Sequence, residues 1–194
     1  MEKYVSRAAL KLASIAKRFR IDFRTKNVLD VGSSTGGFTD FALREGAKKV
    51  ISVDAGTMQM HPRLRLDERI ELHEQTDIRD FKTDQKIDII LIDVSFVSLK
   101  EILPSLKKFA SKADVYAMLK PQFEVGDEAK NKGIVKNERM RRDVFKDFEQ
   151  WVSNTWVIKQ KSDSAISGSK GNIERFYHLK LAKPTRWQDL RIFL

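Results

Sequence analysis

A glycine-rich segment near the N-terminus has the residue types of a ligand-binding turn. Residues 30–38 read Asp-Val-Gly-Ser-Ser-Thr-Gly-Gly-Phe, after a short apolar run and before an amphipathic one. Strand, glycine turn and helix in this order are typical of nucleotide-binding α/β domains. Gly32 lets the chain leave the strand with backbone angles that other residues disfavour. Gly36 and Gly37 let a ligand and the start of the helix approach the backbone closely.

The spacing of these glycines differs from two common phosphate-binding motifs. A dinucleotide fingerprint reads Gly-x-Gly-x-x-Gly and a P-loop ends in Gly-Lys-Ser/Thr, and the segment has neither pattern. A second acid, Asp54, ends the next apolar run, about 20 residues after Gly32, where Rossmann-like domains place a ribose-binding carboxylate. Two acids at strand ends suit a nucleoside joined to an amino acid, as in S-adenosylmethionine. The alternative is that each acid only caps a helix or a turn.

We therefore predict that S-adenosylmethionine binds at this turn. Asp77 is included because it follows the third predicted strand, where a carboxylate can meet an adenine amino group, although a simple turn aspartate is nearly as good an explanation. The candidate cofactor-binding residues are Asp30, Gly32, Ser33, Gly36, Gly37, Phe38, Asp54 and Asp77.

Four charged residues could carry out catalysis next to this cofactor: Lys11, Asp93, Lys120 and Glu174. Asp93 and Lys120 each follow a predicted strand, and open α/β sheets bind ligands at the carboxyl ends of their strands. A ribose hydroxyl is a weak nucleophile until a base removes its proton. A lysine that a second lysine and a low-dielectric site keep partly neutral can be that base. The two carboxylates would orient the lysines and balance their charge.

Hydrophobic periodicity predicts the elements that position these residues. Residues 4–19 have apolar side chains at helical spacing, with Lys11 beside the apolar face. Further helices are expected at 98–110, where Pro104 implies a kink, and at 137–152. Pro62 should restrict any helix within 58–65. Strands are expected from Val28 and at 50–53, 69–73, 87–92, 113–119, 155–161 and 173–180, the last carrying Glu174, with loops at 127–137 and 162–172.

These elements predict an α/β fold, a Rossmann-like class I S-adenosylmethionine-dependent methyltransferase. Its seven-stranded, mostly parallel sheet should carry helices on both faces. We expect three parts: a basic N-terminal helix and linker at 1–26, a methyltransferase domain at 27–183, and a C-terminal tail at 184–194. The tail would dock on the body or on a partner.

Composition narrows the class of protein. The chain has 194 residues, no cysteine and three histidines, which excludes disulfides and thiolate metal sites and predicts no metal. No apolar run is long enough for a transmembrane helix and no signal region is apparent, so a cytoplasmic protein is expected. The net charge of +10 suits a polyanion such as nucleic acid or an anionic membrane, although solvated lysines alone could account for it.

Seven motifs, in order, resemble the TlyA family, also called hemolysin A, whose catalytic domain is FtsJ-like. They lie at 4–12, 30–39, 53–54, 93–96, 119–124, 132–135 and 171–174. The resemblance implies ribose 2′-O-methylation of cytidine in ribosomal RNA, with S-adenosylmethionine as methyl donor and ribosomal RNA or ribosomal subunits as partner. By position, Lys120 would be the general base, completed by Lys11, Asp93 and Glu174. Asp30, Gly32, Gly36 and Asp54 would hold the cofactor.

Two departures from the family pattern affect these expectations. Family members usually carry a small RNA-binding domain ahead of the catalytic domain, and this sequence begins almost at the catalytic domain. We therefore expect that module to be absent from the protein or trimmed from this chain. Ala165 and Ser169 stand where prolines are expected, which predicts a more mobile loop before Glu174.

Three other functions are alternatives to methylation of ribosomal RNA. The absence of a spanning segment argues against a membrane-active hemolysin, and the four charged residues argue against a cofactor-binding protein without catalysis. The basic N-terminal segment makes a small-molecule substrate less favoured. The sequence does not indicate an oligomeric state.

Overall fold

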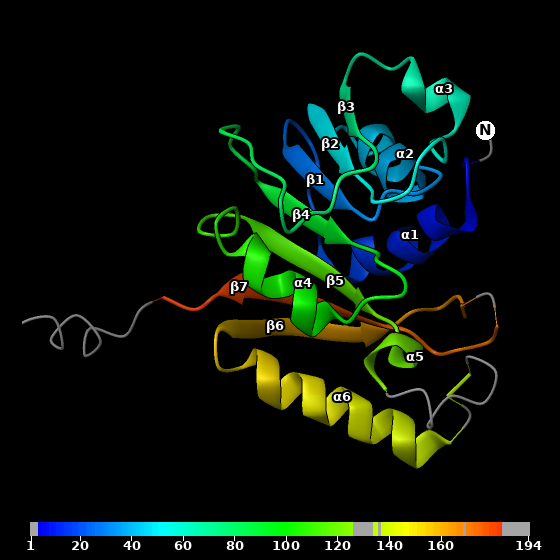
Figure 1. Cartoon of the computed structure of the whole chain (residues 1–194), viewed down its shortest axis with the longest axis vertical. Coiled ribbons are helices and arrows are strands. Elements are labelled where there is room, and N and C mark those ends of the chain that lie inside the picture. Colours follow the sequence, from blue (N-terminus) through cyan, green and yellow to red (C-terminus); the bar gives the residue numbers. More distant parts are fainter. Residues whose placement is uncertain (1–3, 126–133, 136, 169, 184–194) are drawn as a thin grey trace, which may run out of the picture.

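A seven-stranded sheet forms the centre of the computed structural model, which describes residues 4–125, 134–135, 137–168 and 170–183. The strand order within these residues is β3-β2-β1-β4-β5-β7-β6 (Figure 1). The strands are β1 Asn27–Val31, β2 Lys49–Val53, β3 Ile70–His73, β4 Ile89–Ile92, β5 Asp114–Leu119, β6 Trp156–Asp163 and β7 Arg175–Leu181.

The sheet is mostly parallel, as predicted. Strands β1 to β5 pair in parallel, whereas β7 is antiparallel to both β5 and β6. Every residue of β4 is buried, which explains its unbroken apolar sequence, because both faces of a parallel sheet are covered by other elements. The carboxyl ends of the parallel strands therefore meet along one edge of the sheet.

Helices cover both faces of the sheet, which confirms the predicted fold class. Helices α1 and α2 pack on one face, where Leu12 and Phe19 join a core with Tyr116 and Phe176. Helices α4 and α6 pack on the other face, in a core that includes Phe148. The helices are α1 Arg7–Phe19, α2 Gly37–Arg44, α3 Pro62–Arg65, α4 Leu99–Leu106, α5 Pro121–Glu124 and α6 Glu138–Val152.

Pro62 restricts the helix in its segment, as expected: α3 begins only at Pro62, where the missing N–H costs nothing, and the His61 ring accepts the N–H of Arg63 at 3.2 Å. Two other local expectations were wrong. Glu174 lies just before β7 rather than within it. Pro104 does lie inside a helix, α4, which ends at Leu106 instead of reaching residue 110.

Part of the sequence-based description lies outside the described residues: most of the loop at 127–137, Ser169, and the tail at 184–194. The three-part division of the chain stays a prediction. Helix α1, which was expected to form part of a separate N-terminal segment, shares its core with strands β1, β4, β5 and β7. In the described part of the chain, no helix is both long and apolar enough to cross a membrane.

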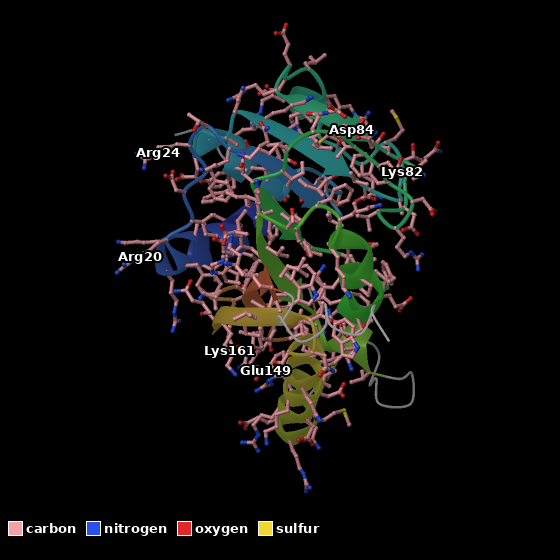
Figure 2. The ribbon with its side chains drawn as sticks, turned by 90° about the vertical axis from the view of Figure 1, so that its left-hand side faces the viewer. Arg20, Arg24, Lys82, Asp84, Glu149 and Lys161 are labelled. Atoms are coloured by element: carbon pink, nitrogen blue, oxygen red, sulfur yellow. The ribbon has the colours of Figure 1, made fainter. Side chains whose placement is uncertain are left out.

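Exposed side chains of both charges lie at the side of the sheet opposite the carboxyl ends of the strands. Figure 2 turns this side toward the viewer, with Arg20, Arg24 and Lys82 at the surface. Arg24 is paired with Asp22, at 2.8 Å between the guanidinium nitrogen and the carboxylate oxygen.

The packing of α1 gives a first prediction. Leu12 is fully buried between α1 and the sheet, so Leu12→Ala should lower the free energy of unfolding by about 2–5 kcal/mol. Leu10, on the same helix, is 45% exposed, so Leu10→Ala should change it by less than about 0.5 kcal/mol. Urea denaturation of both variants measures the difference. Equal losses would show that α1 is not part of the core.

Candidate active site

The parallel strands bring their following residues to one place. Val31 at the end of β1 pairs with Val53 of β2 and with Ile92 of β4, so Gly32, Asp54 and Asp93 follow neighbouring strand ends. A Cβ atom on Gly32 would lie 2.8 Å from the carbonyl oxygen of Asp93, and the φ of Gly32 is +80°. Only glycine fits this position, because a side chain would meet both strain and backbone.

A cleft of about 430 Å³ opens beside these strand ends. A cavity of this size with apolar walls and a few carboxylates can hold a nucleoside-sized ligand. Three of the predicted cofactor residues, Gly32, Asp54 and Asp77, line it. Its lining also includes Ser34, Gly56, Gln59, Thr76, Ile78, Arg79, Asp93, Val94, Ser95, Phe96, Val97 and Ile102.

The Asp54 carboxylate is held in a fixed orientation by backbone donors. Its Oδ2 accepts the N–H of Ser34 at 2.8 Å and its Oδ1 accepts the N–H of Gly56 at 2.7 Å. An ionised carboxylate has about four acceptor positions, so two remain for a ligand. Fixed in the cleft wall, Asp54 can accept hydrogen bonds from a pair of ribose hydroxyls.

Asp77 lies in the cleft wall but already has a partner. The Arg79 side chain donates to its carboxylate, with Nε 2.9 Å from Oδ1, and holds the pKa of Asp77 below its usual range. Asp77 is therefore ionised and acceptor-only at neutral pH. Its contact with an adenine amino group stays a prediction.

Asp30 is completely buried beneath the glycine turn and is not among the described residues that line the clefts. Its Oδ2 accepts the hydroxyl of Thr39 at 2.6 Å, and that hydroxyl lies 2.8 Å from the hydroxyl of Ser52. Burial raises the pKa of Asp30 from 3.8 to about 7. The geometry gives Asp30 a supporting place under the turn, and direct contact with a cofactor stays a prediction.

The paired glycines serve packing. A Cβ atom on Gly36 would lie 2.4 Å from the side chains of Met60 and Leu64, which come from the α3 segment. A Cβ atom on Gly37 would lie 2.2 Å from the hydroxyl of Ser6, just before α1. Close contact between the turn and these two segments therefore requires glycine at both positions.

A second, smaller cavity of about 130 Å³ joins the glycine turn to the catalytic candidates. Its lining includes Ser33, Gly37, Phe38, Asp93, Ser95 and Lys120. The Ser33 hydroxyl is buried and has no hydrogen-bond partner among the described residues, so it is available to a ligand. The structure thus brings Ser33, Gly37 and Phe38 next to the predicted general base.

The four catalytic candidates form two ion pairs. Lys120 Nζ lies 2.6 Å from Asp93 Oδ1, and Lys11 Nζ lies 2.6 Å from Glu174 Oε2. All four side chains are at most 14% exposed. Because Leu119 of β5 pairs with Arg175 of β7, Lys120 and Glu174 occupy facing positions just beyond that pair. Four residues that are scattered in the sequence therefore meet at one edge of the sheet.

Sequence reasoning missed the contacts that tie the loop after β4 to the segment after β5. Lys120 Nζ lies 2.8 Å from Ser95 Oγ, and the rings of Phe96 and Phe123 lie 5.2 Å apart. The Glu124 carboxylate accepts the N–H of Leu99 at 2.8 Å and the hydroxyl of Ser98. The sequence showed the motifs at 93–96 and 119–124 separately, but neither motif indicated that the two segments contact each other.

Phe96 is the most exposed of the large apolar side chains in the described chain. It is 91% exposed and has a φ of +67°, a rare conformation for a bulky residue. Such backbone strain tends to occur at functional sites. Phe96 also lines the larger cleft, so an aromatic ring stands at its mouth, open to solvent.

Residues 4–181 match the family described as FtsJ-like methyltransferase. The chain belongs to this family. It is 42% identical over 180 residues to the 23S rRNA (cytidine-2'-O)-methyltransferase TlyA of Campylobacter jejuni, covering 91% of this chain and 71% of the relative. The resemblance to TlyA proteins is confirmed.

Solved structures agree with the family assignment. A candidate hemolysin from Lactococcus lactis is 36% identical, with a TM-score of 0.89, covering 94% of this FtsJ-like chain and 90% of that one. A candidate S-adenosylmethionine-dependent methyltransferase from Listeria monocytogenes is 18% identical, with a TM-score of 0.62 and coverage of 91% and 100%, which shows the same fold. The predicted methyltransferase fold is therefore confirmed.

The burial of Asp30 gives a prediction about pH. Between about pH 4 and pH 7 the folded protein keeps a proton that unfolded Asp30 loses, so unfolding becomes easier as the pH rises. Asp30→Asn cannot titrate but can still accept from Thr39. The free energy of unfolding of this variant, minus that of the wild type, should increase across this range.

Chemical denaturation at several pH values between 4 and 8 measures this difference. Asp84→Asn serves as a control, because Asp84 is exposed and lies before β4 rather than after it. The free energy of unfolding of Asp84→Asn, minus that of the wild type, should stay nearly constant with pH. A constant difference for Asp30→Asn as well would show that Asp30 titrates normally.

Proposed function

We propose that this protein transfers a methyl group from S-adenosylmethionine to the 2′-hydroxyl of a cytidine ribose in ribosomal RNA. The observation that carries the proposal is the pair of lysine–carboxylate ion pairs beside the cleft. The name of the Campylobacter jejuni relative, a 23S rRNA (cytidine-2'-O)-methyltransferase, supports the substrate. A ribosomal RNA substrate also agrees with the cytoplasmic location expected from the sequence.

The residues of the two cavities fit this methyl donor. Asp54 has two acceptor positions left for ribose hydroxyls, and Ser33 has a buried hydroxyl without a partner among the described residues. The glycine turn contains no basic side chain for phosphates, in agreement with a ligand that has none. When bound, S-adenosylmethionine would supply the methyl group. The bond between the ribose oxygen and the methyl carbon would form as the carbon–sulfur bond breaks, and the electrons of the broken bond would stay on sulfur.

Lys120 is the residue placed to remove the ribose proton. Lys120 lines the small cavity, which adjoins the larger cleft because Gly32, Ser34, Asp93 and Ser95 line both. The Asp93 carboxylate, 2.6 Å away, stabilises the ammonium that forms when the proton is accepted. Proton removal by a positioned base makes the hydroxyl oxygen a better nucleophile.

The pair of Lys11 and Glu174 lies near the pair of Lys120 and Asp93, because Glu174 faces Lys120 just beyond the pairing of β5 with β7. Glu174 is 2% exposed and holds the Lys11 amino group in one position, so a positive charge is kept near Lys120. A fixed positive charge stabilises the negative charge that develops on the ribose oxygen. Alignment of the oxygen with the methyl group then accounts for much of the remaining acceleration.

The rim of the cleft suits RNA. Phe96 presents its ring to solvent beside Phe123, and exposed aromatic rings stack on the bases of unpaired RNA. The net charge of +10 favours association with a polyanion at low salt. A small-molecule substrate gives no reason for the exposed ring of Phe96 at the rim.

The deciding experiment measures transfer of labelled methyl from S-adenosylmethionine to isolated ribosomal subunits, with 2′-O-methylation mapped on the RNA. Label at a cytidine ribose supports the proposal. Label on a small molecule, or none on RNA in either subunit, contradicts it. Leakage of dye from vesicles, measured in parallel, tests the membrane activity that the name of the Lactococcus lactis structure suggests.

Removing the proposed base should abolish the reaction. Lys120→Ala should lower kcat at least about 100-fold, because general-base catalysis contributes roughly 10²- to 10⁴-fold. The dissociation constant for S-adenosylmethionine should change by less than about twofold. Lys107→Ala, an exposed lysine at the end of α4, should leave both values unchanged. Wild-type turnover by Lys120→Ala would remove Lys120 from the mechanism.

Asp54 should be needed for binding of the cofactor. Asp54→Ala removes the acceptor of two ribose hydroxyls, and hydrogen bonds to a charged group contribute about 1.5–3 kcal/mol each. The dissociation constant for S-adenosylmethionine, measured by calorimetry, should rise at least about tenfold. Asp84→Ala, on an exposed loop at the opposite edge, is the matched control. An unaltered constant for Asp54→Ala would refute the ribose contact.

A further inference from the structure

We infer that Ser95 is a positioning residue for the base Lys120: together with Asp93, its hydroxyl aims the amine lone pair of Lys120 at the small cavity. The inference rests on the proposed function, which makes Lys120 the base. The chain thus contains a fifth residue that acts in the reaction, through Lys120 rather than on the substrate.

The contacts of the Lys120 amino group support this role. Nζ lies 2.6 Å from Asp93 Oδ1 and 2.8 Å from Ser95 Oγ. The Lys120 side chain is only 11% exposed, so water has little access to replace either partner. Asp93 and Ser95 both come from the loop after β4, whereas Lys120 directly follows the neighbouring strand β5. Both partners are thus held by the same loop.

Two partners restrict the orientation of the Lys120 amine more than one partner would. A neutral lysine amine has two N–H bonds and one lone pair, in three directions around the Cε–Nζ bond. Once Lys120 has lost its proton, Ser95 accepts one N–H and the Asp93 carboxylate lies 2.6 Å from Nζ on another side, so the lone pair takes the direction that neither partner occupies. Lys120 also lines the cavity of about 130 Å³ beside the glycine turn, where the ribose hydroxyl is expected. With Asp93 alone, the amine could still rotate between two orientations.

The loop itself is fixed, so that Ser95 keeps its position. The residue after it, Phe96, has a φ of +67°, and its ring packs against Phe123. Two and three residues further on, Ser98 and Leu99 both donate to the carboxylate of Glu124. Burial raises the pKa of Glu124. These contacts connect the loop of Ser95 to the segment that begins with Lys120.

The test compares Ser95→Ala with Ser95→Thr in the full chain, using ribosomal subunits and labelled S-adenosylmethionine. Ser95→Ala should lower kcat about 10- to 100-fold, because misdirection of a reacting group has effects of this size. The KM for subunits and the dissociation constant of the cofactor should stay within about twofold. Ser95→Thr keeps the hydroxyl and should retain most of the wild-type rate.

Ser105→Ala is the matched control. Ser105 lies on α4, downstream of the same loop, and its hydroxyl donates to the carbonyl of Ile102 rather than to Lys120. It should have wild-type kcat. An unchanged kcat for Ser95→Ala would overturn the inference. An increase in kcat would also overturn it, because it would show that the Ser95 hydroxyl donates to the lone pair of the amine and blocks it. An equal loss in Ser95→Thr would also overturn it.

A readout that does not depend on turnover separates this inference from the proposed function. Nitrogen-15 NMR of the Lys120 amino group reports how fast its protons exchange with water. Exchange should be faster in Ser95→Ala and nearly normal in Ser95→Thr. If the wild type methylates no RNA but shows this pattern, the proposed function fails while the positioning by Ser95 stands. Equal exchange rates in all three proteins would overturn the positioning.

Discussion

The ion pair between Lys120 and Asp93 is the interaction on which the rest of the site depends. Both side chains are largely removed from water, and their charged atoms lie 2.6 Å apart. A buried charge without its partner is costly, so the pair stabilises the site only if both strands end in the correct register. The parallel pairing of β4 with β5 supplies that register. The carboxyl ends of the strands therefore position the catalytic candidates and also form the wall of the cleft beside them.

The second ion pair shows why α1 is needed. Lys11 and Glu174 are separated by 163 positions in the sequence, yet their charged atoms are 2.6 Å apart. The apolar face of α1 packs on the sheet through Leu12 and Ile15, which places Lys11 at the start of β7, beside Glu174. The first helix thus combines two properties in one element. Its apolar face contributes to the core, and a lysine beside that face contributes to the site.

The glycine turn shows how packing and binding overlap. Its pattern predicted a ligand, and Gly32 does lie in the cleft wall against the backbone of Asp93. Gly36 and Gly37 instead allow the α3 segment and the chain before α1 to approach the turn. Asp30 supports the turn from below, buried and bonded to Thr39. A motif that looks like a set of ligand contacts is in part a set of packing contacts.

The sequence by itself determined the fold class and the edge at which the site lies, because apolar runs, a glycine turn and charges at strand ends are local patterns. It also identified Lys11, Asp93, Lys120 and Glu174 as a group, with the help of family resemblance. Only the tertiary structure decided which lysine pairs with which carboxylate, since that depends on the register of β5 with β7 and on the packing of α1. It also decided the contact of Ser95 with Lys120, because the direction of a loop side chain depends on turn conformation and on neighbours distant in sequence.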